Sequence, residues 1–163
     1  MMMIEYKQIG IIRSPYDDIK GMPIQPSGAT GNSGYIELMP EFSEGLDDLI
    51  GFSHIILLYM FHKSEGFSLK VKPFLDTIER GVFSTRAPRR PNPIGLSIVK
   101  VVEVKENIVS IENVDILDGT PLIDIKPYVP EFDSHPVERT GWLEKAKGRV
   151  QTKKSDDRFG NVS

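Results

Sequence analysis

Hydrophobic residues along this chain fall mostly in short runs that are rich in β-branched and aromatic side chains, a composition that favours β-strands. The clearest run, S-H-I-I-L-L-Y-M-F at 53–61, is too short for a typical buried helix, so we predict a buried strand there. The polar residues Lys105-Glu106-Asn107 separate two other runs and predict a hairpin. The strands that we expect cover 4–13, 35–38, 53–61, 69–73, 81–85, 98–104, 108–114 and 122–125.

Two segments depart from this strand pattern. Residues 41–50 carry Phe42, Leu46 and Leu49 at helical spacing, so we predict a short amphipathic helix that ends at Gly51. Residues 17–33 are rich in Gly, Pro and Ser and predict a long loop. Loops of this length are usually functional or disordered.

The C-terminal part of the chain becomes polar and Lys-rich after Trp142. We expect one short helix at 143–150 and a disordered tail beyond residue 151. The chain therefore divides into a core domain, 1–142, and a polar C-terminal extension, 143–163.

These elements predict a mainly β protein, a single-sheeted small β-barrel with one or two short helices. Strands and helices do not alternate as βαβ units require, and no G-x-G-x-x-G motif follows a predicted strand. A Rossmann-type nucleotide-binding domain is therefore disfavoured.

Composition limits the kinds of site that the chain can build. It has 163 residues, enough for one domain with its own core, and no cysteine. The lack of cysteine excludes disulfides, thiolate nucleophiles and zinc sites built on thiolates, and we expect no metal. No apolar run approaches the ~20 residues of a membrane span, so we expect no membrane contact and a cytoplasmic location by default.

The net charge of −3 at pH 7 does not indicate a nucleic-acid binder, because domains that grip phosphate backbones are often clearly basic. The basic residues are unevenly spread, however: Arg86, Arg89 and Arg90 fall within five residues. Such a local patch is compatible with a small RNA contact without establishing one.

The same arginines belong to an unusual segment, G-V-F-S-T-R-A-P-R-R-P-N-P-I-G-L at 81–96, which also contains three prolines. One interpretation is a rigid surface turn in which the prolines only fix φ. The other is a stiffened binding loop that holds Arg86 and Asn92 with little conformational freedom. The chemistry of the segment leaves both open.

A second candidate segment, 114–128, places Asp115, Asp118 and Asp124 around an Asp-Gly turn. Turn aspartates most often cap backbone amides. They also accept hydrogen bonds from ribose hydroxyls in nucleotide sites, whereas the spacing of a calcium-binding loop is absent. His62, at the end of the apolar run, is either a structural histidine or a site residue.

Taken in order along the chain, these segments resemble the TsaA-like family, also called TrmO. The resemblance extends over roughly residues 4–142. The matching elements are I-G-I-I-R-S-P-Y (9–16), P-I-Q-P (23–26), G-F-S-H-I (51–55), F-H (61–62), G-V-F-S-T-R-A-P-R-R-P-N-P-I-G-L-S (81–97) and L-D-G-T-P-L-I-D-I-K-P-Y-V-P (117–130).

This resemblance implies a β-barrel that binds S-adenosylmethionine, forms a homodimer with the cofactor near the subunit interface, and methylates N6 of threonylcarbamoyladenosine beside the anticodon of tRNA. Bacterial members often have a further C-terminal region, so we expect differences in tRNA docking rather than in the cofactor site. The cofactor residues that it implies are Pro26, Ser27, Gly28, His62, Lys63, Arg86, Leu96, Leu117, Asp118, Gly119 and Thr120.

The mechanism that we infer has the Asp118-Gly119-Thr120 turn presenting a carboxylate and backbone amides to the cofactor. On the acceptor side, Arg89 or Arg90 engages the threonylcarbamoyl carboxylate or a neighbouring phosphate, because arginine suits bidentate contacts with both. Arg86 serves the cofactor. The remaining substrate-binding candidates are Asn92 and Lys126, and the candidates for the catalytic proton acceptor are Asp124, Tyr128 and His62.

Two other functions stay open on the sequence. One is a methyltransferase of the same family that acts on a different nucleoside or on a small molecule. The other is a non-catalytic module that binds S-adenosylmethionine and acts as a sensor or adaptor.

Overall fold

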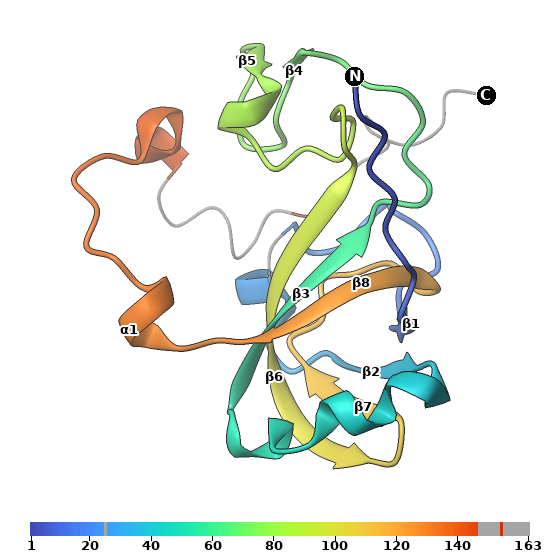
Figure 1. Cartoon of the computed structure of the whole chain (residues 1–163). Helices are drawn as coiled ribbons and strands as arrows, with labels where there is room; N and C mark the ends of the chain where they lie inside the picture. The colour runs from blue at the N-terminus through green and yellow to red at the C-terminus, as the bar shows by residue number, and fades with distance from the viewer. Residues whose placement is uncertain (25, 147–153, 155–163) are drawn as a thin grey trace.

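Six antiparallel strands close into a barrel in the computed structural model of the chain, which describes residues 1–24, 26–146 and 154. Their order is β1-β2-β7-β6-β3-β8, and β1 pairs with β8 to complete the ring (Figure 1). The prediction of a mainly β, single-sheeted barrel is confirmed. The barrel strands are β1 (Gly10–Arg13), β2 (Ser33–Leu38), β3 (His54–Met60), β6 (Ile94–Lys105), β7 (Ile108–Glu112) and β8 (Thr120–Pro127).

The longest strand, β6, pairs with β3 along one edge and with β7 along the other. Gly95, Ser97, Val99 and Val101 are buried, and the residues between them are more exposed, so one face of β6 points into the barrel. The predicted hairpin between β6 and β7 is confirmed, with Glu106 in the left-handed region of the turn at φ 55°.

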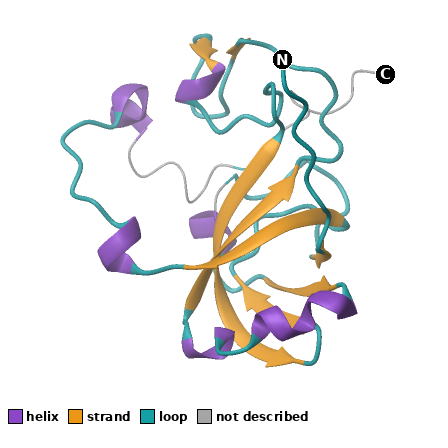
Figure 2. Cartoon of the chain, in the orientation of Figure 1, coloured by secondary structure: helices purple, strands orange, loops and turns teal. Residues whose placement is uncertain are grey.

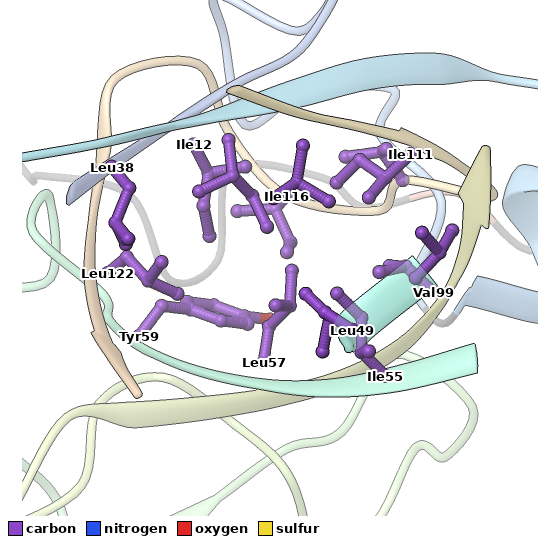
Figure 3. Packing of buried hydrophobic residues seen from close by; sticks show 14 of the residues in the cluster. Ile12, Leu38, Leu49, Ile55, Leu57, Tyr59, Val99, Ile111, Ile116 and Leu122 are labelled. Atoms are coloured by element: carbon purple, nitrogen blue, oxygen red, sulfur yellow. The ribbon is translucent and has the colours of Figure 1, made fainter. Parts of the chain in front are cut away.

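Aliphatic side chains from all six strands fill the barrel interior, as Figure 3 shows. Ile12, Ile36, Leu57 and Val99 are each fully buried. Removing this apolar surface from water is the main stabilisation of the barrel. Tyr59, which carries a hydroxyl, is an exception in this cluster (Figure 3).

A β-bulge interrupts the ladder between β3 and β8. Leu58 lies opposite Asp124, whereas the next residue, Tyr59, lies opposite Leu122. A bulge re-aims the side chains around it and is often found beside an active site. This one lies where Tyr59 turns into the barrel.

Short helices and one small hairpin surround the barrel (Figure 2). The hairpin pairs β4 (Lys70–Val71) with β5 (Arg80–Gly81) beyond the end of β3 (Figure 1). No helix among the described residues is long and apolar enough to cross a membrane. The helices are α1 (Pro130–Asp133) and the 3-10 helices η1 (Pro26–Ala29), η2 (Pro40–Leu46), η3 (Leu49–Gly51), η4 (Val82–Ser84) and η5 (Gly141–Ala146).

The helix predicted at 41–50 is found as two shorter helices rather than as one continuous helix. Two 3-10 helices, η2 and η3, occupy this stretch, and they are separated where Asp48 adopts a left-handed conformation at φ 65°. Leu46 and Leu49 are buried as the helical spacing required. The left-handed residue breaks the continuous i to i−4 hydrogen bonding of an α-helix while both leucines still reach the core.

The strand predicted at 81–85 is mostly 3-10 helix. The hydroxyls of Ser84 and Thr85 donate to the carbonyl oxygens of Gly81 and Val82, each over 2.8 Å. Such local side-chain bonds compete with a strand ladder, and only the first residue of the predicted strand pairs, as part of β5.

The strand predicted at 4–13 begins only at Gly10, because pairing with both β2 and β8 starts at that residue. The predicted helix at 143–150 is found as η5, and its residues 147–150 lie outside the described part. The tail predicted beyond residue 151 also lies outside it, apart from Lys154. That residue forms an isolated bridge with Pro23 in the predicted long loop.

Candidate functional site

A cavity of about 1070 Å³ lies where the ends of several strands and loops meet. Residues from 19–24, 59–64, 73–75, 83–98, 115–120 and 142–143 line it. Strand β6 contributes from both faces, with the inward Gly95 and Ser97 and the outward Leu96 and Ile98. The cavity therefore reaches from the barrel interior over the outer side of β6.

Three cavity-lining side chains form a hydrogen-bonded chain. Ser97 Oγ donates to Oδ1 of Asp115 over 2.6 Å and lies 2.9 Å from the Tyr59 hydroxyl. A serine hydroxyl has one proton to donate, so in the second bond Tyr59 is the donor. Ser97 and Tyr59 are only 1% and 6% exposed. Because breaking a buried hydrogen bond is costly, these bonds hold the three side chains in one arrangement.

Burial raises the pKa of Asp115 to about 6, and its hydrogen bond from Ser97 and the nearby Arg86 guanidinium act in the opposite direction. The carboxylate is therefore ionised at neutral pH and more basic than an ordinary aspartate. Burial first, and the Asp115 charge second, raise the pKa values of Tyr59 and Tyr16. Both phenols keep their protons at neutral pH.

The Asp-Gly turn before β8 is fastened to β1 and to the loop that follows it. The N–H of Asp118 donates to the Tyr16 carbonyl over 2.6 Å, and the N–H of Gly119 donates to the Ile12 carbonyl over 3.0 Å. The Asp118 carboxylate accepts a bond of 3.1 Å from the Ser14 N–H. Gly119 has φ +75°, which favours glycine. The turn amides expected to face the cofactor are thus engaged within the protein.

Thr120 and His62 meet at the first residue of β8. Thr120 Oγ1 donates to the Leu117 carbonyl over 2.6 Å and lies 3.4 Å from His62 Nδ1. Since the Thr120 hydroxyl has only one proton, the imidazole must be the donor in the second contact. Desolvation, and then the Lys63 charge, lowers the pKa of His62. The imidazole is therefore neutral at pH 7. All four residues line the cavity.

The Pro- and Arg-rich loop forms another wall of the cavity. Arg90 Nη1 donates to the carbonyls of Thr85 and Ala87 over 3.0 and 3.3 Å. The N–H of Phe61 donates to the Pro93 carbonyl over 2.8 Å and ties the loop to the end of β3. These bonds, together with the fixed φ of proline, hold the loop in one conformation.

Two aromatic residues from distant parts of the chain also line the cavity, Phe83 of η4 and Trp142 of η5. The Trp142 Nε1–H donates to the Ser84 carbonyl over 2.8 Å, and the Arg80 guanidinium lies 6.0 Å from the Trp142 ring centroid. Phe83 is 75% exposed. Leu143, the first residue of the C-terminal extension, also lines the cavity.

Comparison with known proteins identifies the family of this chain. The model of the tRNA-methyltransferase O N-terminal domain matches residues 11–134, which is most of the chain. The chain belongs to the TrmO family. The resemblance found in the sequence motifs is confirmed, and Trp142 lies beyond the matched region.

Individual relatives of this TrmO-family chain differ in length. A probable S-adenosyl-L-methionine-binding protein of Pyrococcus abyssi is 54% identical over 99% of this chain and 88% of the relative. The tRNA (adenine(37)-N6)-methyltransferase of Escherichia coli is 35% identical over 90% of this chain and 66% of the relative. The crystal structure of TrmO from Pseudomonas aeruginosa is 39% identical with a TM-score of 0.74, over 86% of this chain and 62% of that chain. The chain thus spans just under two thirds of the two bacterial proteins.

The structure brings two groups of predicted site residues together at the cavity. From the predicted cofactor set these are His62, Lys63, Arg86, Leu96, Leu117 and Thr120, and from the predicted substrate set Arg90 and Asn92.

Other predicted site residues have other surroundings. Asp118 lines a separate small depression with Arg13, and Gly28 belongs to η1. Pro26 and Ser27 begin the same helix, and their side chains lie outside the described part. Arg89 is half-buried, with its carbonyl accepting the Ser68 N–H over 3.3 Å.

Three predicted residues on or after β8 lie apart from the residues that line the cavity. The Asp124 carboxylate pairs with the Lys126 ammonium at 2.7 Å. The Tyr128 N–H donates to the His54 carbonyl over 3.1 Å, at the first residue of β3, whereas His62 follows the last. Tyr128 therefore lies at the opposite end of the β3-β8 ladder from His62.

Tyr59 and Ser97 are cavity residues that the sequence analysis did not name, and it named Asp115 only as one of three aspartates around the Asp-Gly turn, with no role assigned. The strand predicted at 98–104 starts after Ser97, whereas β6 starts at Ile94. With that start, Ser97 shares the inward face of Val99. A serine at a core position is the signal that a correct strand boundary would have given.

Proposed function

We propose that this chain is an S-adenosylmethionine-dependent methyltransferase that modifies adenosine in tRNA, with N6 of threonylcarbamoyladenosine beside the anticodon as acceptor. The observation that carries this proposal is the family match over 11–134. Relatives named tRNA (adenine(37)-N6)-methyltransferase support the reaction, and archaeal relatives named S-adenosyl-L-methionine-binding proteins support the cofactor.

The cavity suits a ligand pair of this kind. Its volume of about 1070 Å³ is at the upper end for small-molecule sites, which typically enclose roughly 300–1,000 Å³. It is therefore large enough for a cofactor and a nucleoside together. Ser64 is one of its lining residues, and its Oγ is buried without a hydrogen-bond partner among the described residues. Such an atom suits a ligand that completes its bonding.

The cofactor side consists of Leu96, Leu117, His62 and Thr120. The two leucines form apolar walls, and the Thr120-His62 pair supplies a fixed, uncharged polar surface. When bound, S-adenosylmethionine supplies an electrophilic methyl group on a positively charged sulfur. These residues contribute mainly by holding the donor carbon in line with the acceptor nitrogen, which accounts for much of the rate of such displacements.

The acceptor side carries the charge that a threonylcarbamoyl carboxylate requires. Of the two arginines considered for this contact, Arg90 lines the cavity beside Asn92. One guanidinium nitrogen of Arg90 holds the loop, and its remaining N–H groups suit the carboxylate. Phe83 and Trp142 provide aromatic surfaces of the kind on which unstacked bases of RNA loops stack.

The direct test is methylation of tRNA isolated from a strain that lacks this gene. Purified protein is incubated with that tRNA and S-adenosylmethionine. The tRNA is then digested, and its nucleosides are identified by mass spectrometry. Methylated threonylcarbamoyladenosine is the expected product. The matched control is tRNA that lacks the threonylcarbamoyl group, which we expect to stay unmethylated.

Other outcomes identify the alternatives. Methylation of another nucleoside would replace the proposed acceptor, and S-adenosylmethionine binding without transfer would favour a sensor or adaptor. We also expect a cytoplasmic homodimer. Sedimentation equilibrium of the protein with and without S-adenosylmethionine tests the oligomeric state, and a monomer under both conditions contradicts it.

A further inference from the structure

Among the described residues that line the cavity, Asp115 is the only carboxylate. We propose that Asp115 is the catalytic base, which accepts the proton that the acceptor nitrogen loses as it is methylated. This inference rests on the proposed function. It assigns the step to a residue other than Asp124, Tyr128 and His62.

The surroundings of the other two aspartates in this segment, Asp118 and Asp124, favour Asp115 as the base. Asp124 is paired with the Lys126 ammonium at 2.7 Å and lies on β8 outside the cavity lining. Asp118 accepts the Ser14 N–H and faces Arg13 at 3.6 Å. Both carboxylates are thus engaged by neighbours, and neither residue lines the cavity.

Asp115 is held so that it retains capacity to accept a proton. Its Oδ1 accepts one hydrogen bond from Ser97, which is itself fixed by the Tyr59 hydroxyl. A backbone N–H also bonds this carboxylate. An ionised carboxylate has about four lone-pair sites on two oxygens, so these bonds fix its orientation without saturating it. Tyr59 and Ser97 are both buried, and this packing supports the carboxylate as a catalytic group requires.

The proposed step balances without any further reactant. The carboxylate of Asp115 takes the proton from N6, and the electron pair of the N6–H bond remains on nitrogen. Nitrogen forms its new bond to the methyl carbon as the bond from that carbon to sulfur breaks. The electron pair of the broken bond stays on sulfur and neutralises its charge. Asp115 then returns its proton to solvent.

The electrostatic environment fits the role of a base. Burial brings the pKa of Asp115 to about 6, near the operating pH at which a general base is most effective. The charged or titratable groups that face it are Arg86, whose charge lowers its pKa, and the phenols of Tyr59 and Tyr16. Both phenols are neutral at pH 7, so Arg86 is the charged group among these three.

The experiment compares single-turnover methylation by the wild-type protein with that of Asp115→Asn, at saturating S-adenosylmethionine and tRNA, from pH 5 to pH 9. Wild-type transfer at pH 8 is established first, and its absence would count against the proposed function rather than against Asp115. Calorimetric titration measures S-adenosylmethionine affinity for both proteins. Glu112→Gln is the matched control, because Glu112 pairs with Lys100 on β6, outside the cavity lining.

We expect Asp115→Asn to lower the rate by about 10²–10⁴-fold, the usual range for a lost general base, with unchanged cofactor affinity. The wild-type rate falls as pH drops below about 6, and that fall disappears in Asp115→Asn. Ser97→Ala moves the fall to higher pH, because it removes a bond that lowers the pKa of Asp115. A wild-type rate in Asp115→Asn, or a loss confined to cofactor affinity, overturns the inference.

Discussion

Gly95 of β6 lies directly against the ring of Tyr59 on β3. A Cβ atom added at Gly95 would lie 2.2 Å from Cε2 of Tyr59, far inside van der Waals contact. The two residues are cross-strand partners in the β3-β6 ladder, so neither backbone can move away easily. The absence of a side chain at Gly95 is therefore what lets Tyr59 reach Ser97.

We expect Gly95→Ala to destabilise the protein by about 1–3 kcal/mol, the usual cost of overpacking a core, and to displace the Tyr59 hydroxyl from Ser97. Urea unfolding measures the first effect, and the pH dependence of methylation measures the second. Gly45→Ala is the matched control, because a Cβ built there meets no atom within 4 Å apart from its chain neighbours and its own helix backbone. Equal stability of Gly95→Ala and Gly45→Ala would contradict the packing argument.

Asp115→Asn should raise the free energy of unfolding at pH 8, although it lowers the methylation rate. The pKa of Asp115 in the folded protein is raised from 3.8 to about 6, so the folded state binds this proton more tightly. Its stabilising contribution is complete below pH about 4 and is lost as pH rises through about 6.

At pH 8 the wild-type protein therefore carries a buried charge that Asp115→Asn removes, a difference on the order of 3 kcal/mol. We expect Asp115→Asn to be the more stable protein at pH 8, with the advantage shrinking at pH 5. Urea unfolding at the two pH values measures this. Glu112→Gln should show no such pH-dependent gain, and a pH-independent loss in Asp115→Asn would count against a buried charge.

Thr120→Val tests the polar surface that we assign to the cofactor. The substitution keeps the shape of a residue that is 2% exposed but removes the hydroxyl bonded to the Leu117 carbonyl. We expect a stability loss of about 1–2 kcal/mol, typical for a buried hydrogen bond, and weaker S-adenosylmethionine binding by calorimetry. Thr77→Val, at an exposed position outside the cavity lining, is the control. Unchanged binding by Thr120→Val would remove Thr120 from the cofactor site.

Trp142→Ala tests whether the aromatic ring of η5 belongs to the acceptor side. The loss of the ring removes a stacking surface that is worth about 1–3 kcal/mol per base, so we expect the KM for tRNA to rise roughly 5- to 150-fold. Affinity for S-adenosylmethionine should stay the same. Phe132→Ala is the control, since Phe132 is 73% exposed and lies outside the cavity lining. A KM like that of the wild-type protein would exclude Trp142 from acceptor binding.

Local pattern was enough for much of the barrel. The apolar run at 53–61 predicted β3, and the polar break at Lys105-Asn107 predicted the β6-β7 hairpin, because alternation and turn composition act within a few residues. Pattern was misleading at 41–50, where burial of Leu46 and Leu49 is compatible with two separate turns as well as with one helix.

For the site, the sequence by itself indicated the family and three of the segments that line the cavity, because the motifs around His62, Arg90 and Thr120 are short and contiguous. Only the tertiary structure decided which polar groups meet inside it. Ser97 and Asp115 are eighteen residues apart, and Tyr59 is thirty-eight from Ser97. Barrel closure brings these residues together on the inner side of the wall, and the burial that results raises the pKa of Asp115, a property that no local stretch of sequence carries.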